Sequence, residues 1–113
     1  MHELAIALSI ADLATAQARR AGAERIMGIE LDIGSLSGVE ISALDFAMDI
    51  AFRDTLLANT NVKVNRIEAR CECRDCGHEF GAGDLAALCP SCEGSNIRIS
   101  KGMEMQLNSI LIE

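Results

Sequence analysis

Two C-x-x-C pairs constrain this chain of 113 residues more than any other feature. Cys73 and Cys76 form the first pair, Cys89 and Cys92 form the second, and twelve residues separate the pairs. The segment 71–94 holds all five cysteines, four glycines and the only proline, but few large apolar residues. It has too little apolar surface for a core of its own, so it needs a cross-link or a metal ion.

The spacing of the pairs favours a metal site. A C-x-x-C turn directs both of its sulfurs toward one point, and paired cysteines in a reducing compartment suggest metal rather than disulfides. Four thiolates at about 2.3 Å around Zn²⁺ make a closed tetrahedral site without catalytic access. We therefore expect a structural zinc ion on the four paired cysteines, Cys73, Cys76, Cys89 and Cys92. A rubredoxin-like iron site is the alternative, which a colourless protein would exclude.

Four other residues of this segment bear on the same site. Gly77 and Gly94 follow the two pairs at positions where such a turn often needs positive φ. Cys71 could replace Cys73 as a ligand, but C-x-x-x-x-C spacing makes a poorer turn, so we interpret Cys71 as an accessory thiol. His78 is more typical of a surface residue beside the site than of a ligand.

The charge of the chain bears on its partners. The formal net charge is −7, and the segment 68–102 carries four basic and six acidic residues. Nucleic acids and anionic membranes favour clustered Lys and Arg, so we expect neither as a partner. An acidic surface suits cationic ligands or basic proteins. The first residues lack a secretory signal, and no apolar run approaches the ~18 residues that span a bilayer, so we expect a cytoplasmic protein.

Apolar periodicity predicts an α+β fold. It indicates helices over 3–20 and 42–56 and strands over 25–33, 62–68 and 103–112. The last strand resembles the first two in its apolar character, so the cysteine segment is an insertion. We expect two helices packed on a three-stranded sheet, with residues 1–69 plus 103–113 as one domain and 70–102 as an inserted zinc ribbon.

The chain begins Met1-His2-Glu3. The α-amino group, the amide nitrogen of His2 and its imidazole can close adjacent chelate rings around Ni(II) or Cu(II), and a deprotonated amide favours square-planar geometry. A histidine at this position is more often a simple surface residue. Glu3 in a first helical turn also stabilises the helix dipole without being a ligand.

Several motifs together resemble the HypA/HybF family of hydrogenase maturation proteins over essentially the whole chain. They are MHE at the start, ELDIGSLSGVE at 30–40, CRDCGHEF at 73–80, CPSC at 89–92 and GMEMQLNSILIE at 102–113. The resemblance implies Ni(II) at His2 with Met1 and Glu3 nearby, and structural Zn(II) on the four paired cysteines.

The resemblance also implies an activity and partners. These are delivery of nickel to the NiFe-hydrogenase large subunit together with the GTPase HypB, and in some relatives a contribution to urease maturation. We find no nucleophile–base pair and no phosphate-binding loop, so we expect no enzymatic activity. We expect a monomer or a weak homodimer. The alternative function is a zinc-ribbon protein-interaction module without nickel transfer.

Overall fold

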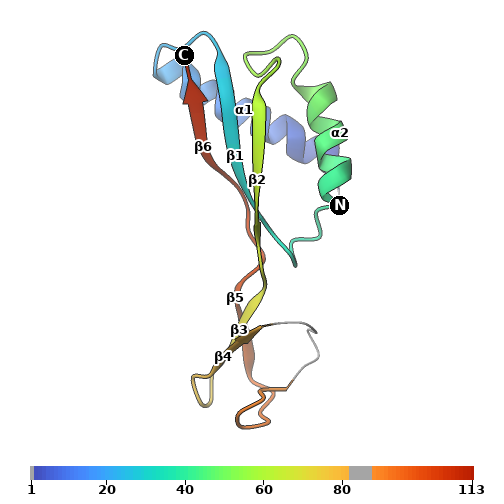
Figure 1. Ribbon diagram of the computed structural model, residues 1–113, viewed down its shortest axis with the longest axis vertical. Coiled ribbons are helices and arrows are strands. Elements are labelled where there is room, and N and C mark those ends of the chain that lie inside the picture. Colours follow the sequence, from blue (N-terminus) through green and yellow to red (C-terminus); the bar gives the residue numbers. More distant parts are fainter. Residues whose placement is uncertain (1, 82–87) are drawn as a thin grey trace. The chain divides into compact units, whose positions relative to one another are not determined.

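The computed structural model describes residues 2–81 and 88–113. Its elements, shown in Figure 1, are α1 (Glu3–Arg20), β1 (Ile26–Gly34), α2 (Ile41–Ala51), β2 (Asn61–Ile67), β3 (Arg70–Cys73), β4 (Glu79–Gly81), β5 (Ile97–Lys101) and β6 (Met105–Ile112). The chain divides into two compact units. Unit 1 is Met1–Asp32, Gly38–Asn65 and Gln106–Glu113; unit 2 is Ile33–Ser37 and Arg66–Met105.

A three-stranded sheet of order β2-β1-β6 and the two helices form the α+β architecture that the sequence predicts. Along β1, Ile29, Leu31 and Ile33 are buried, while Glu30 and Asp32, which alternate with them, are half-buried. This alternation gives the sheet one apolar face, which needs a covering layer. The helices α1 and α2 pack against each other and supply that layer.

The helix α1 has the bounds that the sequence predicts, and Gly22 lies just beyond its end as expected. Gly22 has φ +73°, and the N–H of Ala23 donates to the carbonyl of Ala18 (2.9 Å), as in a Schellman cap. The buried face of α1 consists mainly of alanines, whereas Leu4 and Leu8 are about half exposed. Small side chains let this helix lie close to its neighbours.

The helix α2 is shorter than the predicted 42–56, and residues 52–59 form turns and a bend. Asp54 and Asn59 have φ of 59° and 63°, which a helix does not allow. Phe52 and Leu57 are nevertheless buried. They are buried from the turns and not from a helix, so the apolar residues after Ala51 do not extend α2. No helix in the described part of the chain is long and apolar enough to cross a membrane.

Unit 2 contains a second antiparallel sheet of order β4-β3-β5, whose short strands the sequence analysis did not predict. The turn 34–36 belongs to this unit. Its three N–H groups donate to the carbonyls of Glu104, Ile67 and Gly102 at 2.7–2.9 Å. The hydroxyl of Ser35 also accepts a hydrogen bond from the N–H of Ala69 (3.0 Å). The turn therefore holds together the segments that lead into and out of the small sheet.

Candidate metal sites

The four paired cysteines come together in unit 2. All four Sγ atoms lie within 4.8 Å of one another, with 3.5 Å between Cys73 and Cys92 and 3.6 Å between Cys76 and Cys89. A tetrahedron with metal–sulfur bonds of about 2.3 Å has sulfur–sulfur edges of about 3.8 Å. The cluster therefore has the size and the soft donor set that suit a tetrahedral zinc ion.

Each pair sits on the same kind of turn. In the first turn the N–H of Gly77 donates to the carbonyl of Cys73, and in the second the N–H of Glu93 donates to the carbonyl of Cys89, both at 2.8 Å. In each turn the donor is the residue four positions after the first cysteine. The same cysteine donates its own N–H to a carbonyl five positions on, at 2.9 Å in the first turn and 3.0 Å in the second. Two matching turns thus present two sulfurs each to a shared centre.

The expectation of positive φ is confirmed at Gly77, with φ +78°, but is wrong at Gly94. In the second turn the equivalent residue is Glu93, and its φ is +60°. Gly94 is needed for space instead: a Cβ there would lie 3.2 Å from Cys92 Sγ and 3.2 Å from Asp75 Oδ2. The sequence placed a glycine, Gly94, next to the residue with positive φ, but it did not show that this residue is Glu93.

Crowding makes the sulfurs of Cys89 and Cys92 unequal as acids. Burial raises the pKa of Cys89, but hydrogen bonds from the backbone N–H groups of Cys92 and Ser91 outweigh it and lower the pKa to about 7. At Cys92 the backbone of Gly94 favours the thiolate, yet the neighbouring sulfurs and burial raise the pKa to about 12. A fully ionised cluster therefore needs a cation at its centre.

The other two candidates in this segment lie outside the cluster. Cys71 is buried in β3, where it pairs with Phe80 of β4 and Ile99 of β5. The structure thus joins Cys73, and not Cys71, to the other three cysteines. His78 is exposed, and its ring stacks on Phe80 with centroids 6.0 Å apart. Among the described residues, His78 belongs to no group of potential metal ligands.

At the chain start, two of the predicted nickel residues, His2 and Glu3, lie at the first turn of α1. His2 is exposed and occupies the N-cap position, where its carbonyl accepts a hydrogen bond from the N–H of Ile6 (3.1 Å). Glu3 is the first helical residue. Met1 lies outside the described residues. His2 has no hydrogen bond from its side chain to the helix end, so its imidazole is not used as a cap.

The structure adds Glu40 to this region, which the sequence analysis did not single out. The N–H of Glu40, the N-cap residue of α2, donates to Glu3 Oε2 at 3.4 Å. The carboxylate of Glu40 accepts a hydrogen bond from the hydroxyl of Ser42 at 2.8 Å. The hydrogen bond between Glu40 and Glu3 spans 37 residues of sequence, so no local pattern could have revealed it. It places the backbone of Glu40 beside the Glu3 carboxylate, where α1 begins.

These observations define a class: a small α+β protein with an inserted ribbon built for a tetrahedral metal ion. The family model described as "HypA: Hydrogenase/urease nickel incorporation, metallochaperone, hypA" matches residues 1–112. The chain belongs to this HypA family.

Individual relatives agree with this assignment. The chain is 40% identical over 113 residues to the hydrogenase maturation factor HypA of Chlorobaculum parvum, covering 100% of both chains. It is 37% identical over 110 residues to the hydrogenase maturation factor HybF of Morganella morganii, covering 97% of each. The solution structure of the nickel metallochaperone HypA from Helicobacter pylori matches with a TM-score of 0.73 and 25% identity, over 99% of this chain and 97% of that one.

Proposed function

We propose that this protein is a nickel metallochaperone that binds Ni(II) at its N-terminus and delivers it during maturation of NiFe-hydrogenase. The observation that carries the proposal is the exposed imidazole of His2 at the first turn of α1, in a chain of a nickel-incorporating family. Met1 supplies the α-amine, and His2 supplies its amide and imidazole nitrogens. Glu3 completes the predicted set.

An exposed site at a chain end suits a carrier, because its ligands can exchange without opening a core. The N-terminus of a helix repels a cation, since the helix dipole places partial positive charge there. The carboxylates of Glu3 and Glu40 offset this repulsion. We therefore propose that Glu3 and Glu40 favour the bound cation electrostatically, whether or not either of them is a direct ligand.

Zinc in the tetracysteine cluster has a structural role in this proposal. Cys73, Cys76, Cys89 and Cys92 would hold it, and the closed sulfur shell leaves no coordination position for the nickel cargo. The proposed nickel-binding domain comprises residues 1–69 and 103–113, and the proposed zinc domain comprises residues 70–102. Zinc supplies the cross-link that the small sheet needs.

The proposed partners follow the same function. They are the GTPase HypB and the NiFe-hydrogenase large subunit in the cytoplasm, and the proposal extends to urease maturation proteins. The relatives are named as maturation factors and a metallochaperone, in agreement with a carrier that catalyses no reaction.

The test is metal analysis of the full-length wild type beside His2→Ala, with nickel and zinc counted separately after equilibrium dialysis. We expect His2→Ala to lose the nickel site and keep one zinc ion per chain. His78→Ala is the matched control, because it removes an exposed imidazole that lies outside the cysteine cluster. Equal nickel binding by His2→Ala and wild type would remove the site assignment. A wild type that binds no nickel would favour a zinc-ribbon interaction module.

A further inference from the structure

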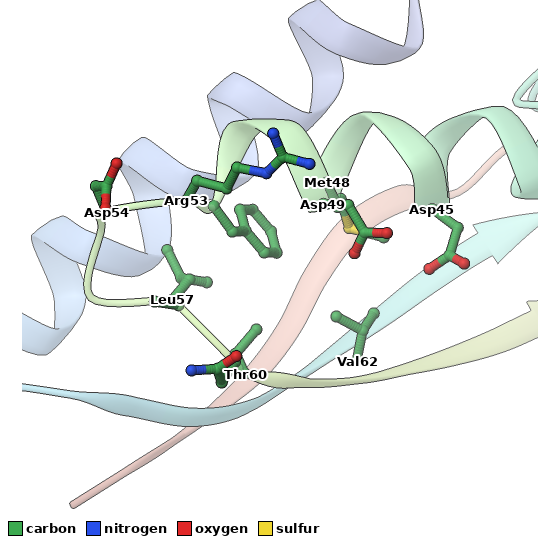
Figure 2. Close-up of a pocket in the computed structure, with 11 residues that line it drawn as sticks. Asp45, Met48, Asp49, Arg53, Asp54, Leu57, Thr60 and Val62 are labelled. Carbon is green, nitrogen blue, oxygen red and sulfur yellow. The ribbon is translucent and has the colours of Figure 1, made fainter.

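A cleft lies in unit 1, on the side of α2 that faces the start of β2. Its volume is about 480 Å³, and its lining residues come from α2, from the segment 52–60 that follows α2, and from Val62. Three buried apolar side chains, those of Met48, Phe52 and Leu57, form part of its wall. Figure 2 shows Met48 on α2 and Leu57 on the segment that follows it. The cleft contains no residue of the proposed nickel or zinc sites.

The polar part of the lining is strongly acidic. Asp45, Asp49 and Asp54 line the cleft, and Arg53 is the only basic residue among the lining side chains. Asp45 and Asp49 are exposed and one helical turn apart, and Figure 2 shows them on the same side of α2. Within the described parts of the chain, none of these four side chains has a hydrogen bond or an ion pair. The carboxylates are therefore available to a cationic partner.

The end of α2 adds to the negative potential. A helix carries partial negative charge at its C-terminus, where basic side chains commonly offset it. The last turn of α1 has Arg19 and Arg20 for this purpose, but the last turn of α2 has no basic residue. Phe52, the C-cap residue of α2, lines the cleft. Arg53, directly after the C-cap, is the one basic side chain of the lining near this helix end, so the helix end and three carboxylates share a single cation.

Thr60 gives an independent sign of a missing partner. Its hydroxyl oxygen is buried and has no hydrogen-bond partner, and Thr60 lines the cleft. Buried hydroxyl groups normally have a partner, because leaving one unpaired is unfavourable. Thr60 therefore leaves an unpaired polar group in the wall of the cleft.

The chemistry of the lining points to an occupant with an apolar stem and a cationic head. Among the described residues, the only group of side chains that converges as metal ligands is the cysteine cluster, so these aspartates do not form a cation cage. Arginine combines an aliphatic stem with a planar guanidinium that has five N–H donors. We infer that this cleft is a docking site for an arginine side chain presented, beside apolar residues, by a partner protein.

The experiment uses the zinc-loaded, ¹⁵N-labelled full chain and two synthetic peptides, acetyl-Leu-Arg-Leu-amide and acetyl-Leu-citrulline-Leu-amide. Citrulline keeps the shape of arginine and removes its charge. We expect the arginine peptide to shift the backbone amides of 45–62 saturably, with an affinity that falls as salt is added. The citrulline peptide should bind much more weakly. Equal binding of the two peptides, or shifts centred elsewhere, would overturn the inference.

Variants test the carboxylates themselves. Asp45→Asn with Asp49→Asn should weaken binding of the arginine peptide by about 2- to 5-fold for each carboxylate removed. Asp12→Asn with Glu24→Gln is the matched control, because it removes the same charge at exposed positions outside this cleft. The inference fails if both double variants lose affinity equally, since general attraction to an acidic protein would then explain the binding. It also fails if neither does.

Discussion

Glu93 and Gly77 occupy the same position in the two cysteine turns, and both have positive φ, +60° and +78°. Each donates its N–H to the backbone carbonyl of the first cysteine of its own pair at 2.8 Å. Glycine adopts this conformation freely, whereas a residue with a Cβ does so at a cost of about 1–2 kcal/mol. The first turn is therefore relaxed at this position and the second is strained.

The first prediction is that Gly77→Ala weakens zinc binding and Glu93→Gly strengthens it. A change of about 1–2 kcal/mol corresponds to about 5- to 30-fold in zinc affinity, measured by competition with a chelator. A Cβ at Gly77 would meet no atom within 4 Å, so the effect comes from the backbone alone. Glu93→Gln separates the conformational effect from loss of charge, and it should leave the affinity nearly unchanged. Equal affinities for Gly77→Ala and wild type would contradict this explanation.

The second prediction concerns the close approach of Gly34 and Gly102 in unit 2. A Cβ built on Gly34 would lie 2.0 Å from the carbonyl oxygen of Gly102, a backbone atom that no side-chain rotation can move away. We expect Gly34→Ala to lower the free energy of unfolding by about 3 kcal/mol or more. Urea denaturation measures this change. Gly81→Ala is the control, because a Cβ there has open space, and it should change stability little.

The third prediction separates the two roles of neighbouring cysteines. Cys73→Ser should lose bound zinc, because it removes one of the four clustered sulfurs. Cys71→Ser should keep one zinc ion per chain but lower stability by about 1–3 kcal/mol, since it puts a hydroxyl at a buried position. Elemental analysis and denaturant unfolding of both variants measure the two effects. Loss of zinc in Cys71→Ser with retention in Cys73→Ser would reverse the assignment.

Prediction from the sequence succeeded where local chemistry decides the structure. The bounds of α1 follow from its apolar spacing and the glycine stop, and the clustering of four cysteines follows from their spacing. The predicted end of α2 was wrong, because the segment after Ala51 turns away and buries Phe52 and Leu57 through tertiary packing that a local pattern does not show. The strands of the small sheet are three to five residues long, too short for a clear alternation of apolar side chains.

The candidate sites divide in the same way. Cysteine pairs carry their own geometry, so the tetracysteine cluster could be assembled from sequence alone. Glu40 beside Glu3 could not, because the hydrogen bond between them depends on how α1 and α2 pack. The acidic cleft is also a product of packing. Its aspartates lie on α2 and in the turns after it. Its apolar wall also includes Leu57, which comes from beyond the predicted helix.

The last prediction is a pH-dependent contribution of Asp32 to stability. Its carboxylate accepts hydrogen bonds from Asn65 (2.9 Å) and Asn108 (3.0 Å), which lower its pKa below the ordinary 3.8. Because the folded-state pKa is the lower one, the stabilisation is present above 3.8 and is lost as the pH falls through the folded-state pKa. Asp32→Ala should therefore unfold at lower urea than wild type at about pH 6, and the gap should narrow at about pH 3. Asp12→Ala, at an exposed site on α1, is the control, and a gap that stays constant with pH would contradict the assignment.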